Sequence, residues 1–477
     1  MNTVQRIAKN VIALGISQII TAILGFFLLI CIARYLGEVG FGKYSFAISF
    51  ISLFAILASL GINNFIIREI ARNRELANKY LTNVLVIKLI LSFFTFTFIV
   101  LTINLMNYPQ DTTRAVYLFG IYTILTSFTL TFTSIFQAFE KMEYNAVISI
   151  IEKIILFLLV FFVLIFGYGL IEVAYVYIFT GIVGTTLSFA VVLVKITKPK
   201  LEIDFLLWKR IIISSIPFAL NTLFAVLFFK IDTVMISVLK GDAAVGIYSA
   251  AYNPLLALTG IISYMITAAL YPVMSKHFIS SKDSLETFTV LSSKYITTIG
   301  FPMAIGCFIL ANQFITLFYV NQFSASIVVF QLLALFIPFR LVSSITGMLL
   351  TSINRQSSRT VSVGFSALFN IALNAVMIPY LSYIGASVAT VLSEVFLYFA
   401  FIYFINKYYR KLKIHRYFIK PMIASLIMGV FVFYFRGINL FLLIILATFV
   451  YFGILTLLRT FTQEDKDLFK QLIYKRG

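Results

Sequence analysis

The sequence predicts an all-α integral membrane protein with about fourteen transmembrane helices. We expect two parallel six-helix repeats that form two lobes, followed by two further helices. Composition, the count of apolar segments and a short repeated motif lead to this prediction. Hydrophobic residues make up 61% of the 477 residues and charged residues only 12%, whereas soluble proteins carry about 25% charged residues. The mean hydropathy of +1.02 excludes soluble enzyme folds.

Fourteen segments are long and apolar enough to cross a membrane. A transmembrane helix needs roughly 20 mainly apolar residues, and these runs are continuous, unlike the alternating strands of a membrane barrel. The predicted spans are residues 10–33, 44–66, 81–106, 115–138, 146–167, 170–194, 211–238, 247–275, 290–312, 326–352, 361–380, 384–406, 417–435 and 439–458.

The basic residues gather on one side of these spans. With the N-terminus placed inside, the inside segments hold 28 of the 37 Lys and Arg residues and the outside segments hold 5. Cytoplasmic loops carry such an excess, so we expect a multi-pass protein of the cytoplasmic (plasma) membrane with both termini in the cytoplasm. This bias also accounts for the net charge of +19, and we predict no binding of nucleic acid.

A short motif occurs twice, 204 residues apart. Residues 34–45 read RYLGEVGFGKYS and residues 238–249 read VLKGDAAVGIYS. Each copy joins two spans and six spans separate the copies, so both face the same side, as parallel repeats do. We expect the glycines to bracket a chain reversal and the tyrosines Tyr44 and Tyr248 to lie at the membrane interface.

The repeat defines the predicted domains. These are an N-terminal six-helix lobe (1–200), a C-terminal six-helix lobe (201–410), two extra transmembrane helices (411–460) and a cytoplasmic amphipathic tail (461–477). In the tail, Thr462 is positioned to cap a helix with Asp465 three residues on, and we expect this helix to lie along the membrane surface.

Several segments resemble one known family. They are ARYLGEVGFGKYSFA near the N-terminus, QAFEKMEYNAVISIIEKI at 137–154, FKIDTVMISVLKGDAAVGIYSAAY at 229–252 and NRQSSRTVSVGFSALFNIALNAVMIPYLSYIGASVATVLSE at 354–394. Together they resemble the polysaccharide transporter family (oligosaccharide flippases, Wzx-like) of the MOP superfamily, which includes the MATE exporters. The resemblance implies a two-lobe transporter that moves lipid-linked oligosaccharides by alternating access. Fourteen spans agree with this branch and with lipid II flippases, whereas MATE exporters usually have twelve.

Seven charged residues lie within the predicted spans, where a charge costs about 2.5–3.5 kcal/mol on insertion scales and usually faces a bundle interior or a watery cavity. The candidates for binding substrate phosphate are Arg340, Lys88, Lys153 and Lys230. The candidates for ion coupling or charge pairing are Asp232, Glu394 and Glu152.

Each cation has a structural alternative. Arg340 has the geometry to hold phosphate oxygens, and an ion pair with Glu394 is the alternative. Lys88 and Lys153 lie about two turns from the cytoplasmic edge, where a lysine can extend its ammonium to the interface.

Other polar residues in the spans have structural explanations. Lys230 and Asp232 are two residues apart, so they point to different sides of their helix and do not pair. Amides in or near the spans are expected to hydrogen-bond across helices: Asn63, Asn64, Asn221, Asn370 and Asn374. The cysteines Cys31 and Cys307 lie in apolar runs and predict neither a disulfide nor a metal site.

We therefore expect a transporter and not an enzyme, because the outside connections are short and hold no arrangement for sugar transfer. No nucleotide-binding loop occurs, so no cofactor is expected, and coupling to Na⁺ or H⁺ is left open. The expected partners are a lipid-linked oligosaccharide, membrane lipids and proteins of polysaccharide assembly, and the chain is expected to be a monomer. The alternatives are a cation-coupled small-molecule exporter of the MATE type and a membrane enzyme of polysaccharide assembly.

Overall fold

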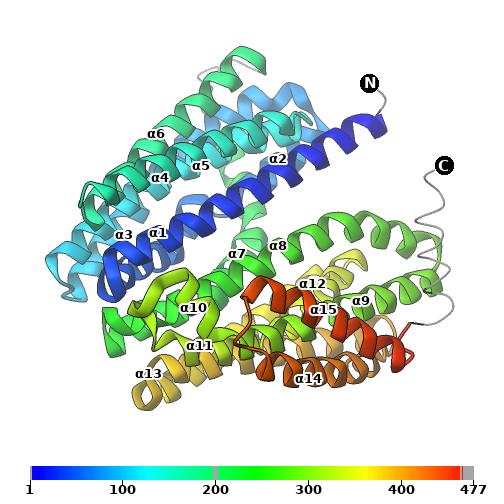
Figure 1. Cartoon of the computed structure of the whole chain (residues 1–477). Helices are drawn as coiled ribbons and strands as arrows, with labels where there is room; N and C mark the ends of the chain where they lie inside the picture. The colour runs from blue at the N-terminus through cyan, green and yellow to red at the C-terminus, as the bar shows by residue number, and fades with distance from the viewer. Residues whose placement is uncertain (1–2, 197–201, 462–464, 466–477) are drawn as a thin grey trace. The chain divides into compact units, whose positions relative to one another are not determined.

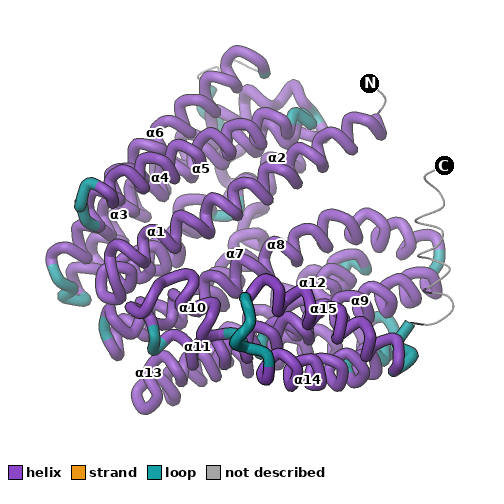
Figure 2. The backbone as a smooth tube through the Cα atoms, in the orientation of Figure 1, coloured by secondary structure: helices purple, strands orange, loops and turns teal. Residues whose placement is uncertain are grey.

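The computed structural model describes residues 3–196, 202–461 and 465, and this described part is almost entirely helical with no β-strand (Figures 1 and 2). Packing divides the chain into two compact units. Unit 1 is Met1–Ala257 with Thr360–Ala389, and unit 2 is Leu258–Arg359 with Thr390–Gly477. The units are defined by packing alone, so the assignment of 1–200 and 201–410 to two repeat lobes stays a prediction.

Unit 1 contains the first seven helices and parts of two others. Its elements are α1 (Thr3–Ser59), α2 (Ile62–Arg72), η1 (Arg74–Leu76), α3 (Ala77–Leu105), α4 (Gln110–Ala138), α5 (Met142–Ile165), α6 (Leu170–Lys195), α7 (Phe205–Lys240), the first part of α8 (Asp242–Ser280) and the middle of α13 (Gln356–Tyr408).

Unit 2 contains the rest of α8 and α13 and the remaining elements. These are α9 (Lys282–Ile309), α10 (Ala311–Tyr319), η2 (Val320–Phe323), α11 (Ser326–Ala334), α12 (Ile337–Ser352), η3 (Ile414–Tyr417), α14 (Ile419–Tyr434) and α15 (Leu440–Leu457).

The helices account for the predicted spans. In the described part, ten helical segments are long and apolar enough to cross a membrane, or twelve if the bent pairs α9–α10 and α11–α12 each count as one span. Two of the twelve, α1 with 57 residues and α13 with 53, are more than twice the length that a membrane core of about 30 Å requires. Each contains one non-helical residue, Gly37 or Ser382. Counted as two spans apiece, they give the predicted fourteen.

Helix α7 begins at an N-cap that is charged and paired. The Asp204 carboxylate accepts a hydrogen bond from the Leu207 backbone N–H at 3.0 Å, which satisfies one of the free donors of the first turn. It also forms an ion pair of 2.6 Å with Lys79. The hydrogen bond from Lys79 and the one from Leu207 hold the pKa of Asp204 below its usual range.

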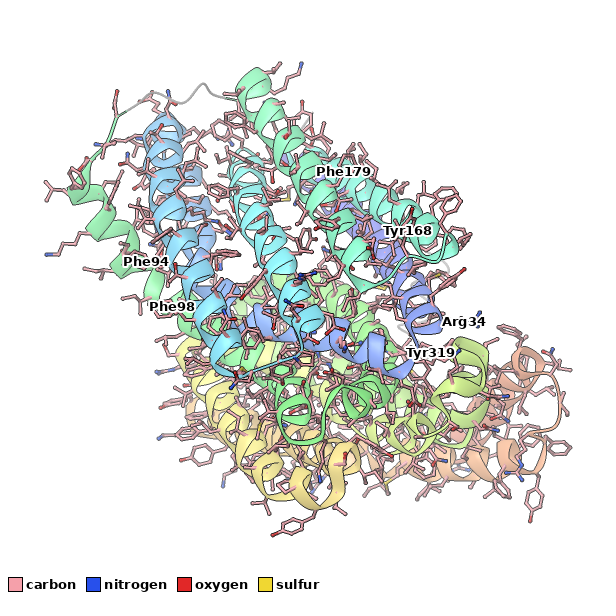
Figure 3. All side chains as sticks on the ribbon, turned by 90° about the vertical axis from the view of Figure 1, so that its left-hand side faces the viewer. Arg34, Phe94, Phe98, Tyr168, Phe179 and Tyr319 are labelled. Atoms are coloured by element: carbon pink, nitrogen blue, oxygen red, sulfur yellow. The ribbon has the colours of Figure 1, made fainter. Side chains whose placement is uncertain are left out.

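Large apolar side chains cover the outer surface of unit 1. Phe94 and Phe98 on α3 and Phe179 on α6 are each about half exposed (Figure 3). A soluble protein rarely exposes such a continuous apolar surface, whereas a membrane protein presents it to lipid. The interior of unit 1 is an apolar core that includes Phe65, Phe132 and Phe136.

The two copies of the motif pack against each other within unit 1. A Cβ atom on Gly42 of α1 would collide with the backbone oxygen of Asp242, and one on Gly246 of α8 would collide with the backbone oxygen of Glu38. Gly246 is the counterpart of Gly42, and Asp242 is the counterpart of Glu38. The contact is therefore reciprocal, which is what a local two-fold axis produces.

This packing corrects the expected roles of the glycines and tyrosines. Gly37 and Gly241 have φ of 67° and 82° and do mark the chain reversals, but Gly42 and Gly246 lie within helices and allow a close backbone approach. The rings of Tyr44 and Tyr248 do not face lipid or water. Both are buried, at 5% and 0% exposure.

Candidate functional site

Asp232 is at the centre of a buried polar cluster in unit 1. The residue lies on α7 and is fully buried. Its Oδ2 accepts a hydrogen bond from the Tyr248 hydroxyl at 2.9 Å, and its Oδ1 accepts one from Asn374 Nδ2 at 2.6 Å. Asn374 Nδ2 also donates to Asn370 Oδ1 at 2.9 Å. Three helices, α7, α8 and α13, thus bring a carboxylate and two amides together.

This cluster has the chemistry of a cation site. Carboxylate and amide oxygens are the ligands that hard cations take in proteins. The Asn374 Oδ1 atom is buried and has no hydrogen-bond partner in the described part of the chain, and an unsatisfied buried acceptor is costly. A bound cation beside Asp232 would satisfy this oxygen.

Glu152 and Lys153 line a second polar site, a cavity of about 90 Å³ among α4, α5 and α6 with Tyr122, Ser149 and Thr180. Gly184 makes room for the acid, because a Cβ there would overlap the Glu152 carboxyl. Among the residues described, neither charged group forms a direct hydrogen bond or ion pair. The cavity has room for about three waters, which can solvate both groups.

The other lysines have different environments. Lys88 is fully buried on α3, and its ammonium donates to the Ser127 carbonyl oxygen at 2.6 Å and to Asn63 Oδ1 at 3.1 Å. It does not extend to the interface, and it joins α2, α3 and α4. Lys230 is half-buried on α7 and, within the described chain, makes no ion pair with Asp232, as the spacing predicts.

Arg340 and Glu394 form the ion pair in unit 2 that was the structural alternative. Arg340 Nη1 donates to Glu394 Oε1 at 2.8 Å, and the side chains are 15% and 3% exposed. Arg340 lies in the first turn of α12, directly after the 43° bend that separates α11 from α12. It is therefore beside a break in a span rather than in the middle of a continuous helix, and Pro338 occupies the start of that helix.

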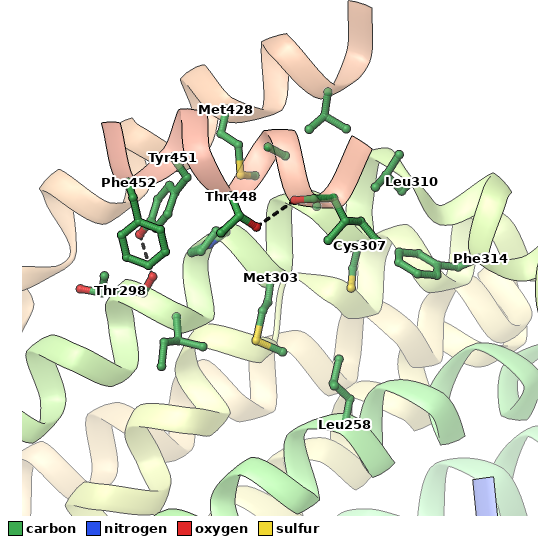
Figure 4. Close-up of a pocket in the computed structure, with 16 residues that line it drawn as sticks. Leu258, Thr298, Met303, Cys307, Leu310, Phe314, Met428, Thr448, Tyr451 and Phe452 are labelled. Atoms are coloured by element: carbon green, nitrogen blue, oxygen red, sulfur yellow. Dashed lines mark hydrogen bonds between the residues drawn. The ribbon is translucent and has the colours of Figure 1, made fainter. Parts of the chain in front are cut away.

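A large apolar cavity of about 380 Å³ lies among α9, α14 and α15 (Figure 4). Met303 and Cys307 of α9 face Met428 of α14 and Tyr451 of α15 across it. The Tyr451 hydroxyl donates a hydrogen bond to the Thr298 carbonyl oxygen at 2.7 Å. With its hydroxyl satisfied in this way, Tyr451 lines the cavity with its aromatic ring. Pockets of this size and lining bind apolar groups.

Two features of these sites were missed in the sequence. Tyr248 was read as an interface residue although it bonds to Asp232, because a motif tyrosine at the start of a span is typical of both positions. The apolar cavity was also missed, because its lining residues have the same composition as any lipid-facing helix. The asparagines Asn370 and Asn374, four residues apart on one helix face, were a usable signal.

The buried acids, the internal ion pair and the broken spans are features of membrane transporters. A family model described as polysaccharide biosynthesis protein matches residues 7–278, more than half of the chain. The chain belongs to this family. The family membership agrees with the resemblance inferred from the motifs.

Two curated relatives cover most of the chain. An uncharacterized membrane protein of Methanocaldococcus jannaschii is 22% identical over an alignment of 474 residues, which covers 92% of this chain and 92% of that one. A probable low-salt glycan biosynthesis flippase of Haloferax volcanii is 23% identical over 395 residues, or 81% of each chain.

Solved structures show the fold. The lipid II flippase MurJ in an inward closed conformation matches with a TM-score of 0.77 and 15% identity, covering 93% of this chain and 98% of that one. An inward-facing multidrug resistance MATE transporter of the MOP superfamily matches with a TM-score of 0.64 and 16% identity, covering 83% of this chain and 95% of that one. This polysaccharide biosynthesis family protein therefore has the MOP fold and stands among flippases and transporters, not among enzymes.

Proposed function

We propose that this protein moves a polyprenyl phosphate- or pyrophosphate-linked oligosaccharide across the cytoplasmic membrane by alternating access, for the assembly of a surface glycan. The polysaccharide biosynthesis family and the similarity to the probable glycan biosynthesis flippase of Haloferax volcanii support this class of substrate. The observation that carries the proposal is the apolar cavity at α9, α14 and α15. It is a place for a prenyl chain, lined by α9 together with α14 and α15, the two helices that follow the twelve-helix core.

The substrate's phosphate needs cationic groups inside the protein. Lys153 and Lys230 are the best placed of the candidates, because each is half-buried and makes no hydrogen bond within the described chain. Lys88 donates hydrogen bonds to two neutral acceptors, and Arg340 forms an ion pair with Glu394. We assign phosphate binding first to Lys153 and Lys230, and a structural role to Lys88.

Coupling to a cation is part of the proposal. The Asp232 cluster supplies the oxygen ligands that Na⁺ requires, and Asn374 Oδ1 is a ready additional ligand. Glu152 is the second candidate and would bind a proton, because an isolated carboxylate in a membrane interior tends to be neutralised. Glu394 is left as the partner of Arg340.

Filling the apolar cavity tests the proposal. Gly306 lines the cavity and has open space around the position of a Cβ, so Gly306→Leu adds side-chain volume at the cavity wall. Gly453 of α15 is exposed and also has open space, and Gly453→Leu is the matched control. In proteoliposomes, Gly306→Leu should abolish translocation of a long-chain lipid-linked oligosaccharide while Gly453→Leu retains it. Full translocation by Gly306→Leu would contradict the assignment of the cavity.

A further inference from the structure

Three arginines converge on one carboxylate where α2 ends. Glu69 has a side chain only 10% exposed, and its Oε1 accepts hydrogen bonds from Arg68 Nε at 3.1 Å and Arg72 Nη1 at 3.5 Å. Its Oε2 accepts one from Arg210 Nη2 of α7 at 3.1 Å. We call these four residues the arginine cluster. It has three positive charges and one negative charge.

Most hydrogen-bond donors of the arginine cluster remain open to a ligand. Each guanidinium carries five N–H donors, and the bonds to Glu69 use one nitrogen of each arginine. The side chains of Arg68, Arg72 and Arg210 are 46%, 71% and 64% exposed. The ring of Phe65 lies 5.5 Å from the Arg68 guanidinium carbon, and among the described residues the three arginines have no hydrogen-bond or ion-pair partner other than Glu69.

A structural role does not account for all three arginines. One cation is enough to neutralise Glu69, and Arg72 also complements the dipole at the C-terminal end of α2. Each additional guanidinium beside the first adds repulsion between like charges. A bound anion would relieve this repulsion, so the cluster is arranged like an anion site with Glu69 holding the arginines in position.

The location indicates which anion would bind. Arg68 lies two residues beyond the apolar segment 44–66 of the second predicted span and Arg210 directly precedes the seventh, 211–238, so we infer that the arginine cluster lies at the level of the lipid headgroups. Arginine forks match phosphate oxygens in a bidentate geometry. We propose that the arginine cluster is a binding site for the phosphate headgroup of a lipid, separate from the lysines and acids within the spans.

Lipid binding to the purified full-length protein tests this proposal without any transport step. The probes are phosphatidylglycerol, farnesyl pyrophosphate and the uncharged farnesol, and native mass spectrometry gives Kd for each. Arg72→Gln and Arg210→Gln should each raise Kd for a phosphate probe about tenfold or more, because each removes charge-assisted bonds. Arg416→Gln is the matched control, since Arg416 is exposed in the α13–α14 connection. Farnesol binding should not change.

The two phosphate probes distinguish the source of the headgroup. If the two cluster variants bind only farnesyl pyrophosphate more weakly than the wild type does, the arginine cluster is a site for prenyl substrates. If they bind only phosphatidylglycerol more weakly, it is a site for membrane phospholipid. If they bind both probes more weakly, it is a general phosphate site. Equal Kd values for wild type, the two cluster variants and Arg416→Gln would overturn the proposal. So would a lower unfolding temperature of the cluster variants at unchanged Kd, which a purely structural clamp predicts.

Discussion

At the scale of single residues, the charged groups within the spans differ in what their surroundings let them do. Asp232 accepts hydrogen bonds from the neutral groups of Tyr248 and Asn374 and has an unsatisfied amide oxygen nearby, whereas Arg340 and Glu394 form an ion pair with each other. The first arrangement leaves a place for a mobile ion. The second stabilises the fold, because each charge of a buried pair makes the other tolerable.

Asp232 should be responsible for a stabilising effect of Na⁺. A ligand that binds only the folded state adds about 2.7 kcal/mol at 100 times its Kd. We expect NaCl, but not choline chloride, to raise the unfolding temperature of the wild type, and Asp232→Asn to remove this difference. Asp283→Asn is the control, because the Asp283 side chain is 82% exposed. Retention of the Na⁺ effect in Asp232→Asn would place the site elsewhere.

Arg340→Ala should destabilise the protein strongly. It leaves Glu394 buried without its partner, and breaking a buried pair costs about 3–5 kcal/mol. Replacing both residues, as Arg340→Met with Glu394→Leu, should recover most of this loss. The measurement is unfolding in detergent. A single variant as stable as the exposed-site control Arg416→Ala would show that the ion pair contributes little and would favour a role in binding phosphate.

The residues of these sites could be found from the sequence, but their partners could not. A charge within an apolar run is visible at once, and Asp232, Glu152 and Arg340 were identified in this way. Whether a partner is a Tyr on the next helix or an Asn more than a hundred residues later depends on helix packing. The arginine cluster was hidden among the basic residues of one membrane side, since Glu69 and Arg210 are 141 residues apart.

At the scale of elements, the fourteen segments were predictable because apolar length alone defines a span. The bends were not. Of the breaks of 72° after α9 and 43° after α11, the second has a sequence signal in Pro338 at the start of α12, but a proline does not by itself show how far a helix bends. The repeated motif can be recognised in the sequence, but its packing cannot, because matching residues in two short segments do not reveal that the two copies touch each other.

Gly42→Ala and Gly246→Ala should each destabilise unit 1. A methyl group at either position overlaps a backbone oxygen of the other motif copy, and overpacking typically costs about 1–3 kcal/mol. The expected result is a lower unfolding temperature for both variants. Gly15→Ala on α1 is the control, because its Cβ would meet no atom within 4 Å. If the two motif variants were as stable as Gly15→Ala, the close approach would not be needed for the fold.

At the scale of the whole molecule, the distribution of basic residues predicts which side of the membrane each connection faces. In a background without Cys31 and Cys307, single cysteines at Arg355 and Arg436 should differ in their reaction with a membrane-impermeant maleimide applied to intact cells. Arg436→Cys should react and Arg355→Cys should react only after the membrane is opened. The reverse pattern would invert the topology.

One measurement tests the proposed transport of a lipid-linked glycan most directly. Wild-type protein is reconstituted in proteoliposomes with a fluorescent polyprenyl pyrophosphate oligosaccharide, and movement between leaflets is followed with Na⁺ and H⁺ gradients imposed separately. The same vesicles are assayed for export of a small fluorescent cation. We predict translocation of the glycan lipid and no export of the cation. Export of the cation without movement of the glycan lipid, under every gradient and with more than one prenyl carrier, would contradict the account and favour a small-molecule exporter.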